Sequence, residues 1–487
     1  MLPTSLPIDG LILEHLLPWL ISDVTSAVRM ASVCSSWRRS VLDYLLHEGA
    51  RTGYGILKIT MPRQKHAEGL NAMMKTYGRY TGELNAPMED DVDELQEVLE
   101  NGAAPNLRTL ATRSLRLNRR LWDCLPKLVR LDLSYHPGIK DDDLSLCCGS
   151  LPNLTELLVV WLCVTGRGWL DGGARRKPWR VLRLERTKVP LARLKVVCDQ
   201  AHEPLVELGL SVHFEKNTRS TDIEQLRKSI ERCSILRVLH LSSTATSDYH
   251  RVIVYPFPSS LRVLCLSGGI IKSGFFYNGL ISCANLCNLE MIRPYFEAPV
   301  EEVNDMFRWV GSNSRMRCVD FSGPSGASDE YLMSFFDGLK TISPASLSVL
   351  GLGEWNITED MLFSLLESCP NITRLGLEYT PVTPERAAFM HGLFSGRIRP
   401  LWDGGVEFRC PVHGTGVAHE HELWDGFRRL LEAGGRIWQL RTEPTYKVEI
   451  PCWDGDFVES FCDKGPTDRC AAESFSRGRV VWYSSSD

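Results

Sequence analysis

Leu236-Arg237-Val238-Leu239-His240-Leu241 is the clearest copy of a pattern that recurs along this chain. Counted from Leu236, the residues at positions zero, three and five are apolar. Side chains alternate between the two faces of a strand, so Leu239 and Leu241 share one face while His240 points to the other. The pattern therefore predicts short strands that each have one buried face and one open face.

The same spacing occurs eleven times between residues 107 and 377, and successive copies start 21 to 31 residues apart. This is the interval of leucine-rich repeats, and the chain resembles that class of protein. Stacked copies bury a continuous apolar ladder that no single copy could bury alone. Thr112 takes position five of the first copy, which is typical of a terminal unit. The copies open at Leu107, Leu128, Leu154, Trp179, Leu205, Leu236, Leu261, Leu286, Met316, Leu347 and Ile372.

The segments between these strands carry helix signatures. Residues 357–362 and 382–385 each place a threonine ahead of acidic residues. A threonine hydroxyl can accept hydrogen bonds from the free amides at a helix start, and acidic residues suit the helix dipole there. Residues 139–144 form a looser version. We therefore predict an α/β fold in which outer helices give a strongly curved horseshoe.

Three cysteines recur at one place in the repeat. Cys233, Cys283 and Cys369 each stand three residues before the first apolar position of the following copy. This placement resembles the cysteine-containing subclass of leucine-rich repeats, whose helix ends in Cys-Pro-x-Leu, and Cys369-Pro370-Asn371-Ile372 is the best match. The resemblance implies that the thiol acts as a small buried hydrophobe, with a redox or metal role as the alternative.

Composition limits the classes of partner. A net charge of -5 argues against general affinity for nucleic acid or for an anionic membrane. Sixteen cysteines without dense clustering suggest reduced thiols, so we expect a cytoplasmic or nuclear protein. The apolar segment 11–21 does not fit a signal peptide, because Asp9 precedes it and Glu14 and His15 interrupt it. No segment approaches the roughly 18 apolar residues that span a bilayer.

Residues 4–46 predict three short amphipathic helices. Leu6-Pro7-x-Asp9, a leucine-rich segment and Val33-Cys34-Ser35-Ser36-Trp37-Arg38 follow in that order. This order resembles the F-box, which runs Leu-Pro-x-Glu, a leucine-rich helix, a second helix and Val-Cys-x-x-Trp-Arg. The resemblance implies docking to a Skp-family adaptor and, through it, to a cullin; the alternative is a helical cap on the solenoid. The residues implied in adaptor binding are Leu6, Pro7, Leu11, Leu16, Leu17, Leu20, Val33 and Trp37.

The expected domains are an F-box-like helical domain (1–50), a partly helical linker (51–104), about eleven leucine-rich repeats (105–395) and a C-terminal cap or tail (396–487). Within the linker, residues 89–99 predict a short acidic helix that ends at Asn101-Gly102. The linker is either a rigid joint or a solvated connection. The tail, in which Trp-Asp-Gly occurs three times, either covers the last apolar layer or offers its aromatic residues as a recognition pocket.

The residues between the buried leucines should face the concave side of the horseshoe, where a protein substrate would bind. Their charges are mixed, so no single ligand class follows from them. By the alternation of the strands, they are Arg130, Asp132, Glu156, Arg183, Glu207, His240, Asn288, Glu290, Asp320 and Arg374.

The early repeats also contain a basic cluster. Between Thr165 and Lys195 there are ten basic residues against Asp171 and Glu185. Arginine side chains favour phosphate and carboxylate, so a phosphorylated or acidic substrate segment, or an inositol phosphate, would bind here. The alternative is a solvated loop in an irregular repeat. The centre of the cluster is Arg175, Arg176, Lys177, Arg180, Arg183 and Arg186.

No pattern for catalysis stands out. The sequence has no nucleophile elbow, Walker loop, His-Glu-x-x-His or properly placed dinucleotide fingerprint. The tail contains residue types that suit zinc, but only Cys410 and His413 have finger-like spacing. We therefore expect a non-catalytic protein without a metal or cofactor. The remaining zinc candidates are His419, His421, Cys452, Cys462 and Cys470.

The order of the parts predicts the substrate-recognition subunit of a Skp, cullin and F-box ubiquitin ligase. Such a subunit holds a target protein near the conjugating machinery and so raises its effective concentration. Two alternatives stay open. One is an interaction scaffold without ligase assembly, and the other is a sensor that holds a small ligand in the horseshoe.

Overall fold

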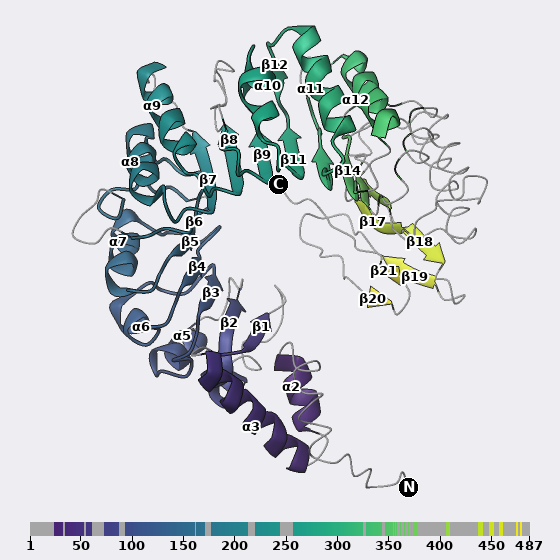
Figure 1. Ribbon diagram of the computed structural model, residues 1–487. Helices are drawn as coiled ribbons and strands as arrows, with labels where there is room; N and C mark the ends of the chain where they lie inside the picture. The colour runs from purple at the N-terminus through teal and green to yellow at the C-terminus, as the bar shows by residue number, and fades with distance from the viewer. Residues whose placement is uncertain are drawn as a thin grey trace. The chain divides into compact units, whose positions relative to one another are not determined.

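A computed structural model divides the chain into two compact units, Met1–Leu236 and Arg237–Asp487 (Figure 1). They are termed the N-terminal unit and the C-terminal unit. The structure describes residues 24–32, 35–52, 55–60, 73–86, 93–160, 162–170, 177–212, 220–243, 257–324, 328–342, 346–353, 355, 357, 361, 365, 369, 372, 374–376, 406–409, 437–441, 448–451, 457–460, 474–475 and 478–479.

The N-terminal unit is built on a parallel sheet in which β1 to β7 follow one another in sequence order. Parallel neighbours in sequence order, each reached through a return segment, are the architecture of leucine-rich repeats. The strands are β1 (Leu57–Thr60), β2 (Thr81–Ala86), β3 (Thr109–Thr112), β4 (Arg130–Asp132), β5 (Glu156–Leu158), β6 (Val181–Leu184) and β7 (Glu207–Val212).

One apolar row runs through the core of this sheet. Each member lies on a different strand, pairs in register with the next and has no exposed surface. The row therefore buries position three of every repeat, counted from its first apolar residue as position zero, as the spacing predicts. It runs Ile59, Leu84, Leu110, Leu131, Leu157, Leu182 and Leu208.

β1 and β2 lie in the segment 51–104, for which we expected a partly helical linker. The sheet therefore begins before the first predicted copy. Gly55 and Gly82 bring the two strands together, since a Cβ atom added to Gly82 would lie 1.8 Å from the carbonyl oxygen of Gly55. Thr112 does not mark the end of the sheet: it is buried, and its hydroxyl accepts a hydrogen bond from the Leu115 amide at 3.3 Å.

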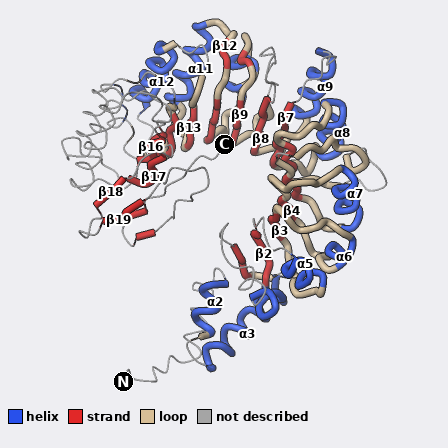
Figure 2. The backbone as a smooth tube through the Cα atoms, turned by 180° about the vertical axis from the view of Figure 1, so that it is seen from behind, coloured by secondary structure: helices blue, strands red, loops and turns tan. Residues whose placement is uncertain are grey.

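The return helices of the N-terminal unit, α5 to α9, lie on one face of the sheet (Figures 1 and 2). The opposite face is termed the open face. The predicted acidic helix is α5, and at α7 the carboxylate of Asp143 accepts a hydrogen bond from the amide of Lys140 at 2.9 Å. The helices are α2 (Val24–Ala31), α3 (Ser35–Thr52), the 3-10 helix η1 (Gly78–Tyr80), α5 (Asp93–Glu100), α6 (Arg119–Asp123), α7 (Asp141–Ser150), α8 (Leu191–Ala201) and α9 (Ser220–Glu231).

Helices α2 and α3 pack on each other and on the start of the sheet. Ala27, Val41 and Leu45 are fully buried. Arg38 donates a hydrogen bond from Nε to the carbonyl oxygen of Ala31 at 3.3 Å, which joins α3 to the end of α2. α2 contacts β1, and α3 contacts η1. These two helices are therefore attached directly to the repeat sheet.

The C-terminal unit has the same architecture. Its parallel strands pair in the order β8, β9, β11, β13, β14, β15, β16 and β17. Leu239, Leu264, Leu289, Val319 and Leu350 are register partners across five of them and are fully buried. The strands are β8 (Val238–Ser243), β9 (Val263–Ser267), β11 (Asn288–Ile292), β13 (Cys318–Asp320), β14 (Val349–Gly351), β15 (Arg374–Gly376), β16 (Val406–Arg409) and β17 (Ile437–Arg441).

The eleven predicted copies are confirmed as strands. Each contains a strand that starts two residues after its first apolar residue, from Leu107 and β3 to Ile372 and β15. Of the predicted helix starts, residues 139–144 lead into α7, whereas 382–385 and most of 357–362 lie outside the described residues.

Two glycines set the packing of the outer helices in the C-terminal unit. A Cβ atom on Gly311 would lie 2.2 Å from the carbonyl oxygen of Phe335, and one on Gly338 would lie 2.3 Å from that of Arg308. α11 and α12 therefore touch backbone to backbone. The helices of this unit are α10 (Phe275–Asn278), the 3-10 helix η2 (Leu280–Ser282), α11 (Val300–Ser312) and α12 (Asp329–Ile342).

In the tail, β16 and β17 continue the parallel pairing beyond β15. Strands β18 (Val448–Pro451) and β19 (Phe457–Ser460) form an antiparallel pair, as do β20 (Ser474–Phe475) and β21 (Gly478–Arg479). A further parallel pair, β10 (Ile270–Ile271) with β12 (Tyr295–Phe296), lies within the repeats. Among the described helices, none has both the length and the apolar character needed to cross a bilayer.

Candidate functional site

The open face of the N-terminal unit carries one register partner per strand, mostly charged. We term this set the charged row. Opposite charges at cross-strand positions attract, and the row has two such pairs. Lys58 Nζ lies 2.6 Å from Glu83 Oε1, and Arg130 Nη1 lies 3.3 Å from Glu156 Oε2. The charged row is Lys58, Glu83, Thr109, Arg130, Glu156, Val181 and Glu207.

The carboxylates of this row are shared between strands. Glu156 is also 3.6 Å from Arg180 Nη1, so a single carboxylate lies between two guanidinium groups. Only 13% of the Glu156 side chain is exposed. Further along, Arg183 Nε donates to Glu207 Oε1 at 2.5 Å. These contacts hold the side chains extended across neighbouring repeats.

Glu185, just after β6, has one carboxylate oxygen that is buried beside the sheet. Its Oε1 is buried without a hydrogen bond, and Arg183 Nε lies 3.9 Å from it. A Cβ atom on Gly209 would lie 2.7 Å from that oxygen, so a glycine makes room for it. Burial raises the pKa of Glu185 above its ordinary value; Arg183 lowers it and Glu207 raises it again.

The structure places the predicted concave residues of the N-terminal unit on strands with half-buried side chains: Arg130, Asp132, Glu156, Arg183 and Glu207. Four of them form the ion pairs just described. Asp132 instead accepts a hydrogen bond from the amide of Ser134 at 2.9 Å. These residues alternate with the buried positions of their strands, and whether they bind a substrate stays a prediction.

In the C-terminal unit, His240, Asn288, Glu290 and Asp320 are likewise half-buried strand residues. Arg374 is the first residue of β15. The carboxylate of Asp320 accepts hydrogen bonds from the amide and the hydroxyl of Ser322, at 2.9 and 2.5 Å. Asp132 and Asp320 occupy the same position in two repeats. Each stabilises the turn that follows its strand.

The residues of the predicted basic cluster make different contacts in the structure. Arg175 and Arg176 lie outside the described residues. Lys177 donates a hydrogen bond to the carbonyl oxygen of Leu151. Arg180 and Arg183 pair with carboxylates of the charged row. The amide of Arg186 donates to the hydroxyl of Ser211, and its side chain is exposed.

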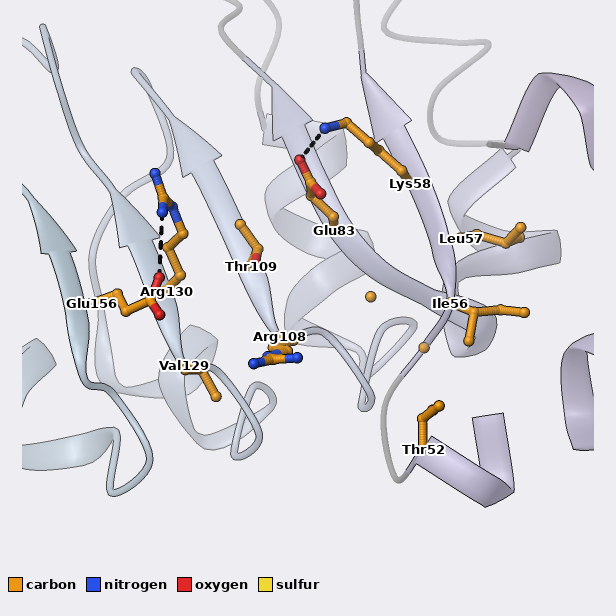
Figure 3. Close-up of a pocket in the computed structure, with 12 residues that line it drawn as sticks. Thr52, Ile56, Leu57, Lys58, Glu83, Arg108, Thr109, Val129, Arg130 and Glu156 are labelled. Carbon is orange, nitrogen blue, oxygen red and sulfur yellow. Dashed lines mark hydrogen bonds and ion pairs between the residues drawn. The ribbon is translucent and has the colours of Figure 1, made fainter. Parts of the chain in front are cut away.

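A pocket of about 340 Å³ opens where β1 to β5 begin (Figure 3). Both ion pairs of the charged row line it, and Arg108 lies at the start of β3, the strand between them. Ile56 and Val129 add half-buried apolar surface, and Thr52, the last residue of α3, forms part of the wall. The polar lining residues are Lys58, Glu83, Arg108, Thr109, Arg130 and Glu156.

Sequence reasoning missed Lys58, Glu83 and Arg108 as site residues. The first two belong to strands in a segment that the sequence predicts to be a linker, and Arg108 precedes the alternating part of its copy. A signal for β1 was present, because Ile56, Ile59 and Met61 also have the spacing zero, three and five. The structure therefore extends the candidate site toward the amino-terminal helices.

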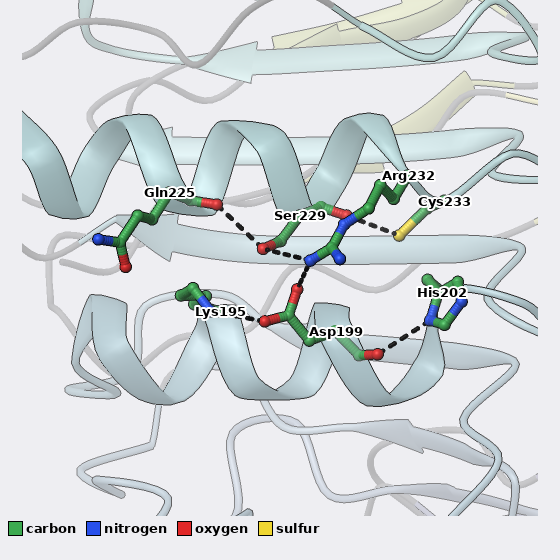
Figure 4. A network of polar contacts seen from close by, with 7 residues as sticks. All are labelled: Lys195, Asp199, His202, Gln225, Ser229, Arg232 and Cys233. Atoms are coloured by element: carbon green, nitrogen blue, oxygen red, sulfur yellow. Dashed lines mark hydrogen bonds and ion pairs between the residues drawn. The ribbon is translucent and has the colours of Figure 1, made fainter.

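The helix side of the N-terminal unit carries a polar network (Figure 4). Asp199 on α8 accepts a hydrogen bond from Lys195 at 2.6 Å and pairs with Arg232, which follows α9. Ser229 donates to the carbonyl oxygen of Gln225 at 2.9 Å. Burial raises the pKa of Asp199, but the hydrogen bond from Lys195 and the positive charge of Arg232 help to hold the pKa below its ordinary value. The network joins two neighbouring repeats.

Most of the predicted adaptor-binding residues lie outside the described residues, namely Leu6, Pro7, Leu11, Leu16, Leu17, Leu20 and Val33. Trp37 is described: it lies in the first turn of α3 and is half-buried. The zinc candidates of the tail, Cys410, His413, His419, His421, Cys452, Cys462 and Cys470, also fall outside the described ranges.

Comparison with known proteins finds similarity of structure only. No protein-family model matches the chain, and no curated protein sequence matches it. A chain of the yeast Rad7 and Elc1 complex aligns with 75% of this chain and 97% of its own length, at 14% identity and a TM-score of 0.42.

Two other solved structures also align with the chain. An internalin, InlF of Listeria monocytogenes, aligns over 84% of this chain and 94% of its own, at 13% identity and a TM-score of 0.29. A chain of the TLR13 and ssRNA13 complex aligns over 76% of this chain and 56% of its own, at 15% identity and a TM-score of 0.32.

Proposed function

We propose that this chain is the target-binding subunit of a Skp, cullin and F-box ubiquitin ligase. Residues 1–50 dock a Skp-family adaptor and, through it, a cullin, while the open face of the repeats binds a protein target. The chain supplies no covalent chemistry of its own. It raises the effective concentration of the target near the subunits that transfer ubiquitin.

The observation that carries the proposal is the combination of two parts in one chain. The pattern from Leu6-Pro7-x-Asp9 to Val33-Cys34-x-x-Trp37-Arg38 resembles an F-box, and a leucine-rich-repeat sheet follows it. Either part alone would be compatible with many functions. Together they favour a protein that connects an adaptor to a target.

The packing of α2 and α3 supports the adaptor-docking role. Trp37 and Arg38 of the F-box-like pattern lie on α3, and Arg38 fixes the end of α2 at 3.3 Å. Both helices contact the first elements of the repeat unit. An adaptor held by this module would therefore have a defined position relative to the open face, which transfer by proximity requires.

The size and polarity of the open face support the target-binding role. Parallel strands lie about 4.8 Å apart, so the β1 to β7 sheet spans about 29 Å. A target that lies along this face would contact several repeats at once. The half-buried charged side chains of the charged row suit a polar protein surface.

The test is capture of a purified Skp-family adaptor by the full chain. We expect the intact chain to bind the adaptor and the triple variant Leu16→Ala, Leu17→Ala, Leu20→Ala to lose at least about tenfold in affinity, the equivalent of about 1.4 kcal/mol. Leu46→Ala is the control, because Leu46 is 50% exposed on α3 and is not part of the F-box-like pattern. Thermal unfolding of each variant accompanies the binding assay.

The unfolding data distinguish two roles for the three leucines, contact with an adaptor and packing in the core of a helical cap. If the three leucines contact an adaptor, the triple variant retains the melting temperature of the wild type. If they form the core of a helical cap, the melting temperature falls as binding is lost. Failure of the intact chain to capture the adaptor overturns the ligase role and leaves an interaction scaffold.

A further inference from the structure

We propose that Arg113 and Tyr135, just beyond the ends of β3 and β4, recognise an acidic residue of the target protein together with the apolar residue next to it. We term these two residues the rim pair. The proposal rests on the target-binding role and names the chemistry of one contact within it. β3 and β4 are neighbours in the sheet and carry Thr109 and Arg130 of the charged row. The rim pair therefore adjoins the face that is proposed to bind the target.

The backbone of Tyr135 has a left-handed conformation, with φ of 63°. Bulky residues rarely adopt this conformation, because it costs free energy that glycine does not pay. Tyr135 stands at position seven of its copy, counted from Leu128 as position zero. Position seven is left-handed in five copies, so the fold requires this turn. The residues there are Tyr135, Arg186 (φ 54°), Gly268 (φ 69°), Arg293 (φ 52°) and Gly323 (φ 70°).

The hydrogen bond made at this turn does not explain the tyrosine. The amide of Tyr135 donates to the carbonyl oxygen of Val160 in the next copy at 2.8 Å. The amide of Gly268 makes the same bond to Ile292 at 2.8 Å, so glycine serves the turn equally well. The side chain of Tyr135 is 51% exposed. Backbone strain kept for an exposed bulky side chain points to a role for that side chain in binding.

The two side chains of the rim pair stack on each other. The guanidinium carbon of Arg113 lies 4.9 Å from the centroid of the Tyr135 ring, which is a cation–π contact. Stacking uses the flat face of the guanidinium group and leaves N–H donors at its edge. Within the part of the chain that the structure describes, no carboxylate pairs with Arg113. The rim pair therefore presents hydrogen-bond donors beside an aromatic ring.

The residues next to the rim pair are fixed by buried polar contacts. The hydroxyl of the buried Thr112 accepts hydrogen bonds from the amides of Ser114 and Leu115, at 3.4 and 3.3 Å. His136 is also buried, and its Nε2 donates to the carbonyl oxygen of Leu115 at 2.9 Å. A contact that is held in place in this way loses little freedom on binding. Tyrosine and arginine are also residue types that carry much of the energy of protein interfaces.

The spacing of the rim pair determines the chemistry of its partner. The single positive charge of Arg113 matches one carboxylate, which arginine binds through two parallel hydrogen bonds. The ring of Tyr135 offers apolar surface to a side chain beside that carboxylate. Consecutive residues of a chain are about 3.8 Å apart at Cα, close to the 4.9 Å that separates the two groups. The occupant is therefore an aspartate or glutamate with an apolar residue directly before or after it.

A randomised peptide library displayed on phage tests the proposal with the full chain as bait. We expect the wild type to enrich peptides in which an acidic residue neighbours an apolar one. Arg113→Gln should lose the acidic preference, and Tyr135→Gly should lose the preference for the apolar neighbour. Tyr135→Phe should keep both, because it retains the ring. A synthetic peptide from the wild-type pool should bind Arg113→Gln and Tyr135→Gly about tenfold more weakly, the equivalent of about 1.4 kcal/mol.

Thermal unfolding distinguishes a binding role of Tyr135 from a structural one. Since glycine fits the left-handed turn, Tyr135→Gly should melt at or above the temperature of the wild type while it loses peptide binding. Arg113→Gln keeps the test decisive if the glycine variant does not fold. Two control variants should leave the selected pool unchanged. They are Arg116→Gln, an exposed arginine of the same repeat that pairs with Asp93 at 3.1 Å, and Tyr295→Ala, a 38% exposed tyrosine of the C-terminal unit.

Three results would overturn the proposal: a wild-type pool without acidic enrichment, an Arg113→Gln pool identical to that of the wild type, or a lower melting temperature of Tyr135→Gly. The adaptor assay distinguishes this failure from failure of the ligase role. Capture of the adaptor without acidic enrichment refutes the rim pair alone. Acidic enrichment that depends on Arg113, without capture of the adaptor, refutes the ligase role alone.

Discussion

Trp169 donates a hydrogen bond from its indole Nε1 to the carboxylate of Asp141, 28 residues earlier in the chain, at 3.0 Å. The same carboxylate accepts hydrogen bonds from the hydroxyl of Thr165 at 2.7 Å and from the amide of Gly166 at 2.8 Å. Asp141 begins α7, and its partners lie in the following repeat. One side chain therefore connects two consecutive repeats.

Replacing Asp141 by asparagine should lower the free energy of unfolding by about 2 kcal/mol, because hydrogen bonds to a charged acceptor become bonds to a neutral one. Asp142→Asn is the control, since Asp142 is the exposed neighbour in the same helical turn. Urea unfolding of both variants measures the difference. Equal stabilities would contradict the role assigned to Asp141.

The contribution of Asp141 should depend on pH. Burial raises its pKa, but hydrogen bonds from Thr165, Trp169 and Gly166 outweigh burial and hold the pKa below the ordinary value. The stabilisation is therefore complete above the pKa of the unfolded chain and is lost as the pH falls through the folded-state pKa. The difference between wild type and Asp141→Asn should shrink on acidification, which urea titrations at several pH values would measure.

Glu185 should show the opposite sign. Burial raises its pKa, and Arg183 only partly offsets this because Glu207 raises it again, so the folded chain binds the proton more tightly than the unfolded chain. Its ionisation costs stability as the pH rises above the ordinary pKa of a glutamate. Glu185→Gln should therefore stabilise the protein at neutral pH and have no effect in acid. An unchanged melting temperature at neutral pH, matching that of the exposed control Glu203→Gln, would contradict the prediction.

The same substitution should have opposite effects at two helical glycines. Gly311→Ala places a Cβ atom 2.2 Å from a backbone oxygen of α12 and should destabilise the protein by about 3 kcal/mol. At Gly149 in α7 a Cβ atom meets nothing within 4 Å, so Gly149→Ala should stabilise the helix by about 0.5 kcal/mol. Thermal and urea unfolding of the two variants test the pair. Destabilisation by both would mean that the helices are packed differently.

The cysteines should differ in reactivity according to burial. Burial raises the pKa of Cys233 and of Cys283 to about 11, whereas Cys163 is exposed. Since the thiolate is the reactive form, iodoacetamide should modify Cys163 in the folded protein and leave the two buried thiols intact. Peptide mass spectrometry before and after unfolding in urea measures this. Equal labelling of Cys283 and Cys163 in the native state would refute the buried, hydrophobic role expected for the repeat cysteines.

The strands with a full leucine pattern could be predicted because a buried ladder tolerates only apolar side chains at its fixed positions. β2 escaped prediction because Thr81 occupies its position zero. Thr81 is fully buried, and its hydroxyl donates to the carbonyl oxygen of Tyr77 at 3.1 Å, so a polar residue fills an apolar place. The starts Ile56, Thr81 and Leu107 are 25 and 26 residues apart. The repeat interval is therefore present at β2, although its first position lacks the apolar residue that marks the other copies.

For the candidate site, the sequence predicts which face of the sheet carries it but not which side chains pair with one another. Alternation determines that Arg130 and Glu156 are on the open side, but it contains no information on which side chain each one pairs with. The contact between Arg183 and Glu207 joins residues 24 apart in sequence, and only the register of β6 and β7 brings them together. Arg108 lies outside the alternating part of its strand and became a candidate only through the pocket that it lines.

α3 ends at Thr52, and Thr52 also forms part of the pocket wall. On the proposed role, a target that contacts this wall lies next to the end of the helix that leads to the adaptor. The lysine that receives ubiquitin is then determined by the length of target chain between this contact and the lysine. Targets would be selected by this spacing as well as by sequence.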